Sequence, residues 1–309
     1  MLDSVTVRVS GKVNLALSVG PLREDGYHDV ATVFQAVSLY DDLTVTAAAP
    51  GSGIRLTVTG EGVGGVPTDS ANLAVRAVEM MAQHGGISDA ILSLNKGIPV
   101  AGGMAGGSAD AAGALVAIDA LCELNLGREY LAEIGAELGS DVPFCLYGGT
   151  ALGTDRGNNI TPALVRGDYY WVLALADEGL STPEVYGRVD YLRDLASVEV
   201  GEPKVPDELM SALLAGDSER VGKALSNDLQ MGATFLRPSL SQLLAAGREA
   251  GALGSIVSGS GPTCAFLARD NIQALDIAVA LTSTGLCRTV KRATGPAFGA
   301  TVIDARSIA

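Results

Sequence analysis

The chain is poor in basic residues, aromatic residues and histidine. Lys and Arg number 21 against 35 Asp and Glu, so the formal net charge is −14. This balance argues against binding duplex nucleic acid or an anionic membrane through a basic face. Only His28 and His84 are available, which disfavours a His/Cys zinc site and most histidine-dependent nucleophilic chemistry.

Paired cysteines and long apolar runs are also missing. Cys122, Cys145, Cys264 and Cys287 are far apart and form no C-x-x-C pair, which predicts reduced thiols. No stretch approaches the ~18 consecutive apolar residues of a membrane span. Residues 1–10 alternate like a strand and lack the apolar core of a secretory signal. We therefore expect a cytoplasmic protein with neither a nucleic-acid nor a membrane partner.

What the chain does contain is enough apolar sequence for a large core. Hydrophobic residues make up 48% of the 309 residues and charged residues 18%, which excludes intrinsic disorder. The 39 glycines follow no collagen-like period. They are therefore expected at turns and at close approaches of the backbone.

Periodicity predicts strands first and a mixture of helices and strands later. The expected strands cover residues 5–9, 13–19, 43–46, 54–59, 90–94, 171–175, 254–258, 263–267 and 300–303. The expected helices cover residues 72–83, 111–124, 128–138, 183–195, 207–214, 218–225, 239–251 and 272–284. Because the elements cluster instead of alternating strictly, we predict an α+β fold with two lobes, 1–160 and 161–309, divided between residues 153 and 168.

The most informative segment is a loop of small residues, Gly102–Ser108, between a predicted strand and a predicted helix. Several backbone N–H groups of such a loop can approach one anion, and the positive end of the following helix assists them. Ser108 and Asp110 can bind a phosphate oxygen and Mg²⁺, and Lys96 can neutralise nucleotide charge. Glycine content alone fits a flexible hairpin or a tightly packed helix start equally well. The loop is neither a Walker P-loop nor a Rossmann fingerprint.

Three separate segments resemble the motifs of one superfamily, the galactokinase, homoserine kinase, mevalonate kinase and phosphomevalonate kinase (GHMP) superfamily. Residues 99–112 resemble its ATP-binding motif, residues 10–17 its N-terminal substrate motif, and residues 259–263 its C-terminal glycine motif. The resemblance implies a two-lobed GHMP-kinase fold, with the active site in the cleft between an ATP-binding N-terminal lobe and a substrate-side C-terminal lobe. It implies the following ATP-binding residues: Asn72, Lys96, Pro99, Val100, Ala101, Gly102, Gly103, Met104, Ala105, Gly106, Gly107, Ser108 and Ala109.

Other residues resemble one branch of the superfamily. The run Asp25-Gly26-Tyr27-His28, the later Thr32-x-Phe34-Gln35, and residues 138–144 and 148–151 are similar to the kinases that act on a cytidine-diphosphate-linked methylerythritol. This branch belongs to the non-mevalonate route to isoprenoids. The resemblance implies transfer of the γ-phosphate of ATP to the tertiary 2-hydroxyl of the erythritol, with Mg²⁺ as cofactor.

The same resemblance implies roles for individual side chains. Asp141 matches the catalytic aspartate, able to act as general base, and Lys12 matches the catalytic lysine, which stabilises developing charge. Asn14, on the same strand face as Lys12, is expected to bind the substrate. Tyr27, His28, Thr182 and Tyr186 are expected to form the cytidine pocket, where aromatic rings stack on a base.

Some alternatives stay open at this stage. Asn72 fits a helix cap as well as a residue near adenine, and Ser108 is the candidate metal ligand. Alanine at 105 is expected to avoid backbone conformations reserved for glycine. Another kinase of the superfamily, acting on homoserine, mevalonate or a sugar, and a catalytically inactive ligand sensor are the competing functions. The chain is expected to act as a monomer or homodimer.

Overall fold

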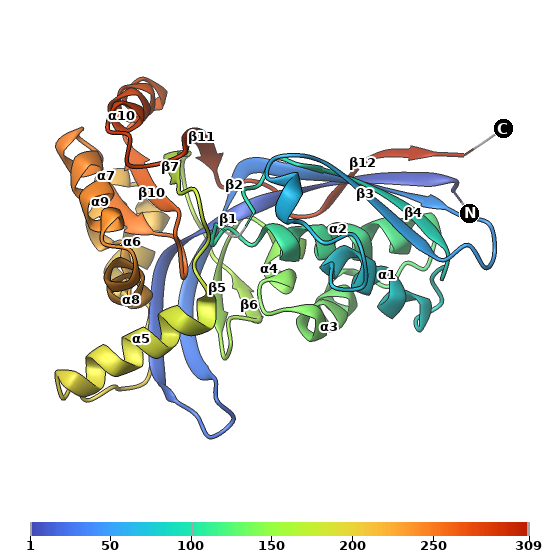
Figure 1. Ribbon diagram of the computed structural model, residues 1–309, viewed down its shortest axis with the longest axis horizontal. Helices are drawn as coiled ribbons and strands as arrows, with labels where there is room; N and C mark the ends of the chain where they lie inside the picture. The colour runs from blue at the N-terminus through green and yellow to red at the C-terminus, as the bar shows by residue number, and fades with distance from the viewer. Residues whose placement is uncertain (1, 101, 308–309) are drawn as a thin grey trace.

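Two β-sheets organise the chain, and a long hairpin of β1 (Ser4–Leu22) and β2 (His28–Ala47) runs from the end that carries the N-terminus and bends to a tip below α5 in the view of Figure 1. The computed structural model describes residues 2–100 and 102–307. The first sheet has the strand order β12-β1-β2-β4-β3; in addition β5 pairs with β2, β6 pairs with β5, and β8 pairs with β1. The second sheet has the order β11-β7-β10-β9.

The bounds of the elements follow from the backbone. The strands are β1 (Ser4–Leu22), β2 (His28–Ala47), β3 (Ile54–Gly60), β4 (Ala90–Lys96), β5 (Thr150–Thr154), β6 (Asn159–Pro162), β7 (Tyr169–Leu175), β8 (Ser226–Asn227), β9 (Gly254–Val257), β10 (Cys264–Ala268), β11 (Thr289–Gly295) and β12 (Thr301–Arg306). The helices are α1 (Leu73–Ala82), α2 (Gly106–Leu121), α3 (Arg128–Leu138), α4 (Val142–Tyr147), α5 (Thr182–Leu195), α6 (Asp207–Ala215), α7 (Ser218–Ala224), α8 (Leu229–Leu236), α9 (Ser239–Glu249) and α10 (Asn271–Ser283), with a short 3₁₀ turn, η1 (Val63–Gly65).

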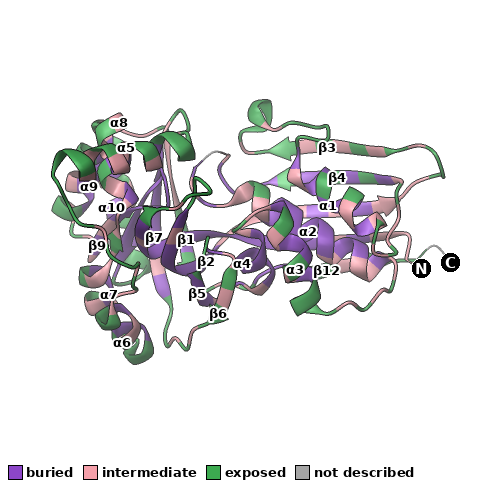
Figure 2. Cartoon of the chain, turned by 90° about the horizontal axis from the view of Figure 1, so that it is seen from below, coloured by how far each residue is buried: buried purple, intermediate pink, exposed green. Residues whose placement is uncertain are grey.

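The antiparallel pair β1–β2 carries the first catalytic candidates. At its start the buried Val5, Val7 and Val9 alternate with outward-facing side chains, as the period of two predicts. Beyond Ser10 almost every residue of β1 is buried, because the strand there runs between other elements (Figure 2). Pairing with β2 shifts register between Ser10 and Gly11 and again after Asn14. Such irregularities re-aim side chains along a strand.

The core is continuous across the strands of both sheets. Helices α1 to α4 lie on one face of the first sheet, with α2 against β1 and β2 (Figure 1). In the second sheet β7 is buried on both faces: Trp171 and Leu173 belong to a core shared with the first sheet, α6 and α7, whereas Val172 and Ala174 belong to a core shared with α5, α8, α9 and α10. The last strand, β12, returns to pair with β1.

The predicted elements are largely present, with differences that have physical reasons. The strands predicted at 5–9 and 13–19 form one strand, because the chain passes through Gly11 and Lys12 with a register shift instead of a turn. Most of β2 was missed, since a strand buried on both faces has no alternation to detect. Helix α2 begins at Gly106, ahead of the predicted residue 111, because packing against the sheet overrides the low helix propensity of two glycines.

All four cysteines are free, as the sequence predicted. Within residues 2–100 and 102–307, no helix combines the length and the apolar character that crossing a bilayer requires.

A buried polar contact joins the two sheets and provides a stability test. Gln35 of β2 accepts a hydrogen bond from the indole of Trp171 at 2.8 Å and donates one to Thr150 Oγ1 at 3.2 Å. We expect Gln35→Met to lower the free energy of unfolding by about 1–3 kcal/mol, because it leaves a buried indole N–H unpaired. Urea denaturation measures the change. The exposed Gln83→Met is the control, and equal midpoints for the two variants would contradict the prediction.

Candidate active site

The glycine-rich loop is packed against a turn from the C-terminal half of the chain. Gly103 has φ +72°, and a Cβ there would clash with the carbonyl oxygen of Ser258. Ser258 in turn donates its hydroxyl to the carbonyl oxygen of Gly103 at 3.1 Å. The positive φ and the close approach both require glycine at 103. The loop and the turn at 258–261 therefore form one surface.

The N-terminus of α2 faces this surface without a side-chain cap. Ala105 occupies the capping position with φ 59° and ψ 31°, in the left-handed region that favours glycine. The expectation that alanine avoids this region is wrong. The conformation costs about 1–2 kcal/mol, which helix packing can offset. Because Ala105 has no side-chain oxygen that could accept from them, the first amides of α2 are available to an anion.

Lys12 and Asp141 lie close together, as the sequence predicted. Lys12 Nζ is 3.5 Å from Asp141 Oδ2 and donates a 2.6 Å hydrogen bond to Asn14 Oδ1. The lysine side chain is 6% exposed and the aspartate 30%. The ammonium is therefore enclosed by protein while the carboxylate remains open to the pocket.

Local sequence explains why Asp141 is free to face the lysine. Helix α3 ends at Leu138, and α4 begins at Val142 with Pro143 in its first turn. Asp141 stands at the capping position of α4 but makes no side-chain cap bond. Proline is tolerated in the first turn of a helix but not in its interior, so α3 and α4 stay separate, and the break between them exposes the carboxylate.

Supporting residues that the sequence reasoning did not assign hold Lys12 and Asn14. Asn14 Nδ2 donates to Thr32 Oγ1 at 2.8 Å, and the Phe34 ring centroid lies 5.4 Å from Lys12 Nζ. A Cβ at Gly259 would lie 3.2 Å from Asn14 Oδ1, so the glycine turn closes over the pair. The Thr32-x-Phe34 run was noticed in the sequence, but only pairing of β1 with β2 shows what it contacts.

One pocket contains the catalytic candidates, and a second continues from it. The first is lined by Lys12, Asn14 and Asp141 together with Thr182, Tyr186 and Ser260, so both halves of the chain contribute. The second is lined by Tyr27 and His28 and shares Val30, Ser140, Arg156, Thr182 and Tyr186 with the first. The predicted substrate residues are therefore brought together along one continuous surface.

Aromatic and charged groups shape the second pocket. The rings of His28 and Tyr186 are 5.1 Å apart, and His28 Nε2 lies 3.0 Å from Asp190 Oδ1. The guanidinium of Arg156 lies over the Tyr27 ring, with its Cζ 3.9 Å from the ring centroid. Burial raises the pKa of Tyr186 to about 12, so its hydroxyl stays neutral. Asp190 and Arg156 were not identified from sequence, because they come from distant parts of the chain.

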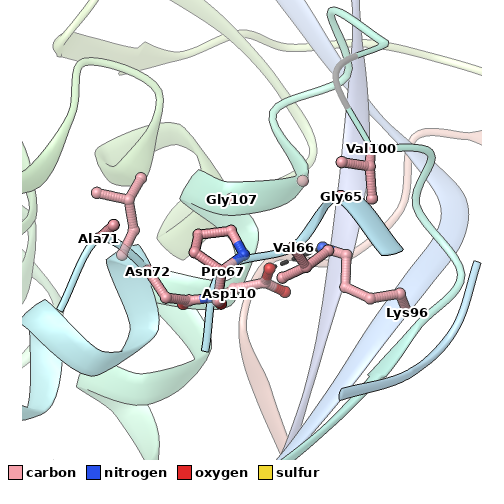
Figure 3. A pocket seen from close by; sticks show the side chains of 11 residues that line it. Gly65, Val66, Pro67, Ala71, Asn72, Lys96, Val100, Gly107 and Asp110 are labelled. Atoms are coloured by element: carbon pink, nitrogen blue, oxygen red, sulfur yellow. Dashed lines mark hydrogen bonds and ion pairs between the residues drawn. The ribbon is translucent and has the colours of Figure 1, made fainter. Parts of the chain in front are cut away.

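A third pocket lies beside the start of α2 (Figure 3). Its lining residues come from the segment before α1, from the end of β4 and from the first turns of α2: Gly65, Val66, Pro67, Ala71, Asn72, Leu73, Lys96, Val100, Gly106, Gly107 and Asp110. Asn72 caps α1, accepting from Ala74 N at 2.9 Å, and donates to Pro67 O at 2.8 Å. The helix-cap interpretation is therefore confirmed, and the same residue lines the pocket.

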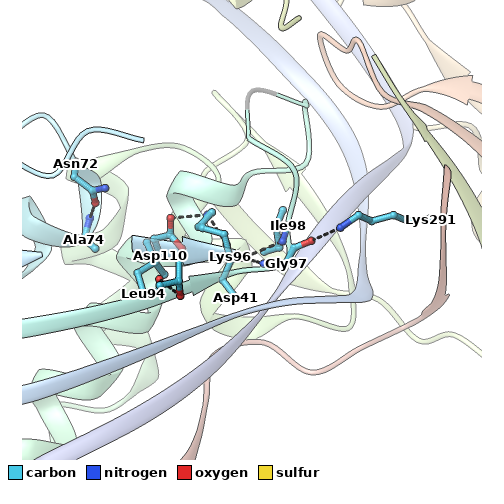
Figure 4. Close-up of polar contacts among 10 residues, drawn as sticks. Asp41, Asn72, Ala74, Leu94, Lys96, Gly97, Ile98, Asp110 and Lys291 are labelled. Atoms are coloured by element: carbon cyan, nitrogen blue, oxygen red, sulfur yellow. Dashed lines mark hydrogen bonds and ion pairs between the residues drawn. The ribbon is translucent and has the colours of Figure 1, made fainter. Parts of the chain in front are cut away.

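Lys96 and Asp110 are paired with each other at the inner side of this pocket (Figure 4). Lys96 Nζ bonds Asp110 Oδ2 at 2.7 Å and also Asp41 Oδ2, and all three groups are buried. Burial would lower the pKa of Lys96, but the two carboxylates raise it. Its charge is thus balanced inside the protein, and the structure does not support a role in neutralising nucleotide charge. Burial raises the pKa of Asp110, and one of its carboxylate oxygens is already engaged by Lys96.

Some of the other predicted loop residues can offer only backbone atoms to a ligand, and others line a pocket with their side chains. Met104 and Ala109 are buried in the core, so only their backbone can face a ligand, and Val100 lines the third pocket. The expectation for Ala101 lies outside the described residues. Ser108 is partly exposed, and its Oγ lies 3.9 Å from where a Cβ of Gly139 would be. Its hydroxyl therefore faces the segment that leads to Asp141.

A cation site made of protein groups alone is not found among the described residues, where no cluster of three His, Cys, Asp or Glu could hold a metal. Ser108 and Asp141 supply oxygen atoms of the kind that Mg²⁺ prefers, and Mg²⁺ usually completes its shell with phosphate oxygens and water. The donor set therefore fits a magnesium ion that arrives with a nucleotide.

Comparison with known families identifies both halves of the chain. The GHMP kinases N terminal domain matches residues 72–149, and the GHMP kinases C terminal domain matches residues 209–285. A curated 4-diphosphocytidyl-2-C-methyl-D-erythritol kinase of Mycolicibacterium smegmatis is 53% identical over 307 residues, covering 98% of this chain and 94% of that protein. The kinase of the same name from Streptomyces coelicolor is 54% identical over 302 residues, covering 97% of this chain and 100% of its own.

Solved structures agree with the sequence matches. A crystal structure of 4-(cytidine 5'-diphospho)-2C-methyl-D-erythritol kinase superposes with a TM-score of 0.76 at 30% identity, covering 93% of this chain and 98% of that one. A homoserine kinase from Cytophaga hutchinsonii gives 0.74 at 20% identity, covering 98% of each chain, and supports the fold alone. The predicted α+β GHMP-kinase fold is confirmed.

The close contact at Gly103 provides a prediction with a matched control. Gly53 has nearly the same φ, +71°, but a Cβ there meets nothing within 4 Å. We expect Gly53→Ala to cost about 1 kcal/mol in unfolding free energy through its backbone alone. Gly103→Ala should cost about 1–3 kcal/mol more, because the loop and the turn must move apart. Thermal unfolding of both variants measures the difference, and equal losses would contradict it.

Proposed function

The chain belongs to the GHMP kinases and, within them, to the 4-diphosphocytidyl-2-C-methyl-D-erythritol kinases, and on this basis we propose the reaction that its pockets perform. The enzyme transfers the γ-phosphoryl group of ATP to the 2-hydroxyl of 4-diphosphocytidyl-2-C-methyl-D-erythritol, giving the 2-phosphate and ADP. The observation that carries the proposal is the enclosed Lys12–Asp141 pair, 3.5 Å apart, beside the glycine-rich loop and at the entrance of the Tyr27–His28 pocket. The reaction belongs to the non-mevalonate supply of isoprenoid precursors.

Lys12 and Asp141 divide the chemistry between them. Phosphoryl transfer through a loose transition state needs positioning and charge stabilisation more than covalent chemistry. Asp141 accepts the proton of the acceptor hydroxyl, for which its exposed carboxylate is available. Lys12, held by Asn14 at 2.6 Å, places its ammonium beside the transferring phosphoryl group. Asn14 also orients the acceptor.

The nucleotide occupies the third pocket and the glycine-rich loop. The adenine and ribose lie between Asn72 and Lys96, and the phosphates lie on the backbone amides at the start of α2. These N–H groups and the helix dipole provide the positive potential that an acidic chain otherwise lacks. Residues 1–160 thus form the ATP-binding lobe, and residues 161–309 form the substrate-side lobe.

The cytidine lies in the second pocket. Tyr27 and Tyr186 offer ring faces for stacking on the base. His28, fixed by Asp190 at 3.0 Å, presents its ring and backbone to the hydrogen-bonding edge of the cytosine. Thr182 links this pocket to the glycine turn, since its hydroxyl lies 2.8 Å from Ser260 Oγ.

Magnesium and cellular context complete the proposal. Mg²⁺ bound to the phosphates would neutralise their charge, with Ser108 as the protein ligand of the ion. Four free thiols support a reducing compartment, and we place the enzyme in the cytoplasm. We propose that it works as a monomer or homodimer.

An ADP-release assay across a panel of alcohols tests the function. Purified protein with ATP and Mg²⁺ should turn over the cytidine diphosphate methylerythritol and leave homoserine, mevalonate and galactose unreacted. The discrimination follows from the Tyr27–His28 pocket, which those small acceptors cannot fill. Turnover of homoserine or mevalonate without turnover of the cytidine substrate would overturn the proposal.

We predict that Asp141→Asn lowers kcat by about 10²–10⁴, because a general base contributes an effect of that size. Affinity for ATP should change little, since the carboxylate faces the acceptor side of the pocket. Steady-state kinetics together with calorimetric titration of an ATP analogue measure both quantities. Turnover near the wild-type rate would remove Asp141 from this role.

The stacking role of Tyr27 gives a prediction on KM. Tyr27→Ala should raise KM for the cytidine substrate about 5- to 150-fold, since stacking on a base contributes about 1–3 kcal/mol. KM for ATP should stay within about twofold. Tyr130→Ala is the control, because Tyr130 on α3 is also an exposed tyrosine, and its hydroxyl bonds His84, away from these pockets. Equal effects on both substrates would place Tyr27 outside the cytidine site.

A further inference from the structure

The outer wall of the nucleotide pocket is a short segment with little support of its own. Gly65, Val66 and Pro67 line the pocket from the stretch between β3 and α1 (Figure 3). Among the described residues, the backbone hydrogen bonds of 62–66 close only local turns, Gly65 to Gly62 and Val66 to Val63. We call residues 62–67 the pocket wall. Its position relative to the glycine-rich loop therefore depends on what holds its two ends.

One end of the pocket wall is anchored within the N-terminal half. Asn72 Nδ2 donates to the carbonyl oxygen of Pro67 at 2.8 Å, while Asn72 Oδ1 caps α1. This contact fixes Pro67 to the start of a buried helix. It does not reach the beginning of the wall, which follows Glu61.

The other end is anchored to the second sheet through Glu61. Its two carboxylate oxygens bind two cations from the C-terminal half: Oε1 lies 2.8 Å from Arg288 Nη1, and Oε2 lies 2.9 Å from Lys291 Nζ. Hydrogen bonds from Lys291 and Arg288 hold the pKa of Glu61 below its ordinary value, so the group is charged at neutral pH. The Glu61 amide also donates to Lys96 O at 2.8 Å.

Lys291 connects the same point to the base of the glycine-rich loop. Its Nζ lies 3.4 Å from the carbonyl oxygen of Gly97, directly after β4 (Figure 4). A cation of the second sheet therefore contacts Glu61, directly before the wall, and Gly97, at the start of the segment that leads from β4 into the glycine-rich loop. The side chains of Glu61 and Lys291 are 20% and 25% exposed, so water screens the pair only in part.

We propose that Glu61 is a positioning residue for the nucleotide, because its bridge to Arg288 and Lys291 fixes the pocket wall against the glycine-rich loop. The inference rests on the proposed function, in that the third pocket is taken as the ATP site. It assigns the C-terminal lobe a part in nucleotide binding that involves no contact with ATP. Loss of the bridge leaves that end of the wall held only by the bond from the Glu61 amide to Lys96 O, and it leaves Lys12, Asp141 and the cytidine pocket unchanged.

The test measures nucleotide binding separately from turnover. Calorimetric titration with a non-hydrolysable ATP analogue is applied to the wild type, Glu61→Gln, Lys291→Met and the double variant. Each single variant should weaken binding about two- to fivefold, the range expected for a partly exposed ion pair. The double variant should lose less than the sum of the two single losses, because both single variants remove the same Glu61–Lys291 pair. In steady-state kinetics KM for ATP should rise while kcat and KM for the cytidine substrate stay at wild-type values.

The control removes an ion pair of the same kind elsewhere. Glu208→Gln breaks the 2.8 Å pair between Glu208 of α6 and Arg220 of α7, and it should leave nucleotide binding unchanged. Unchanged binding in Glu61→Gln, additive losses in the double variant, or an equal loss in Glu208→Gln would each overturn the inference. A wild-type enzyme that binds the analogue but fails to phosphorylate the cytidine substrate would instead overturn the proposed function, and the binding comparison would still decide the role of Glu61.

Discussion

The site depends on one close backbone contact, between Gly103 and the turn that contains Ser258 and Gly259. A side chain at 103 would clash with the Ser258 carbonyl, and one at 259 would approach Asn14 and Lys12. Because neither position carries a side chain, a loop from the first half of the chain and a turn from the second enclose the Lys12 ammonium between them. An enclosed cation acts at lower effective dielectric, where it stabilises developing charge more strongly than in water.

This acidic chain has few basic residues, yet it buries two lysines near the site. Two buried lysines have opposite surroundings: Lys96 is balanced by Asp41 and Asp110, while Lys12 meets one partly exposed carboxylate and a neutral amide. The first arrangement stabilises the base of the glycine-rich loop, since Asp41 also accepts from the amides of Gly97 and Ile98. The second leaves a cation available for chemistry. The two lysines therefore differ in the number of their acidic partners, and only Lys12 is placed for the proposed chemistry.

The sequence predicted the local features well and the long-range ones poorly. Lys12, Asp141 and the glycine-rich loop were predictable, because each belongs to a short motif whose spacing survives in the sequence. The pairing of Lys96 with Asp41 and of His28 with Asp190 was not, since partners 55 and 162 residues apart leave no local pattern. The length of β2 was missed for a related reason: a strand buried on both faces by distant elements does not alternate.

The most direct test of the account is the single-turnover rate of phosphoryl transfer in Lys12→Met, measured by rapid quench with both substrates saturating. If the enclosed ammonium stabilises the transferring group, the rate should fall about 10²–10³-fold, the effect of removing one preorganised donor, while both substrates still bind. A transfer rate close to that of the wild type would contradict the account, because the cation at the centre of the pocket would then have no part in the chemistry.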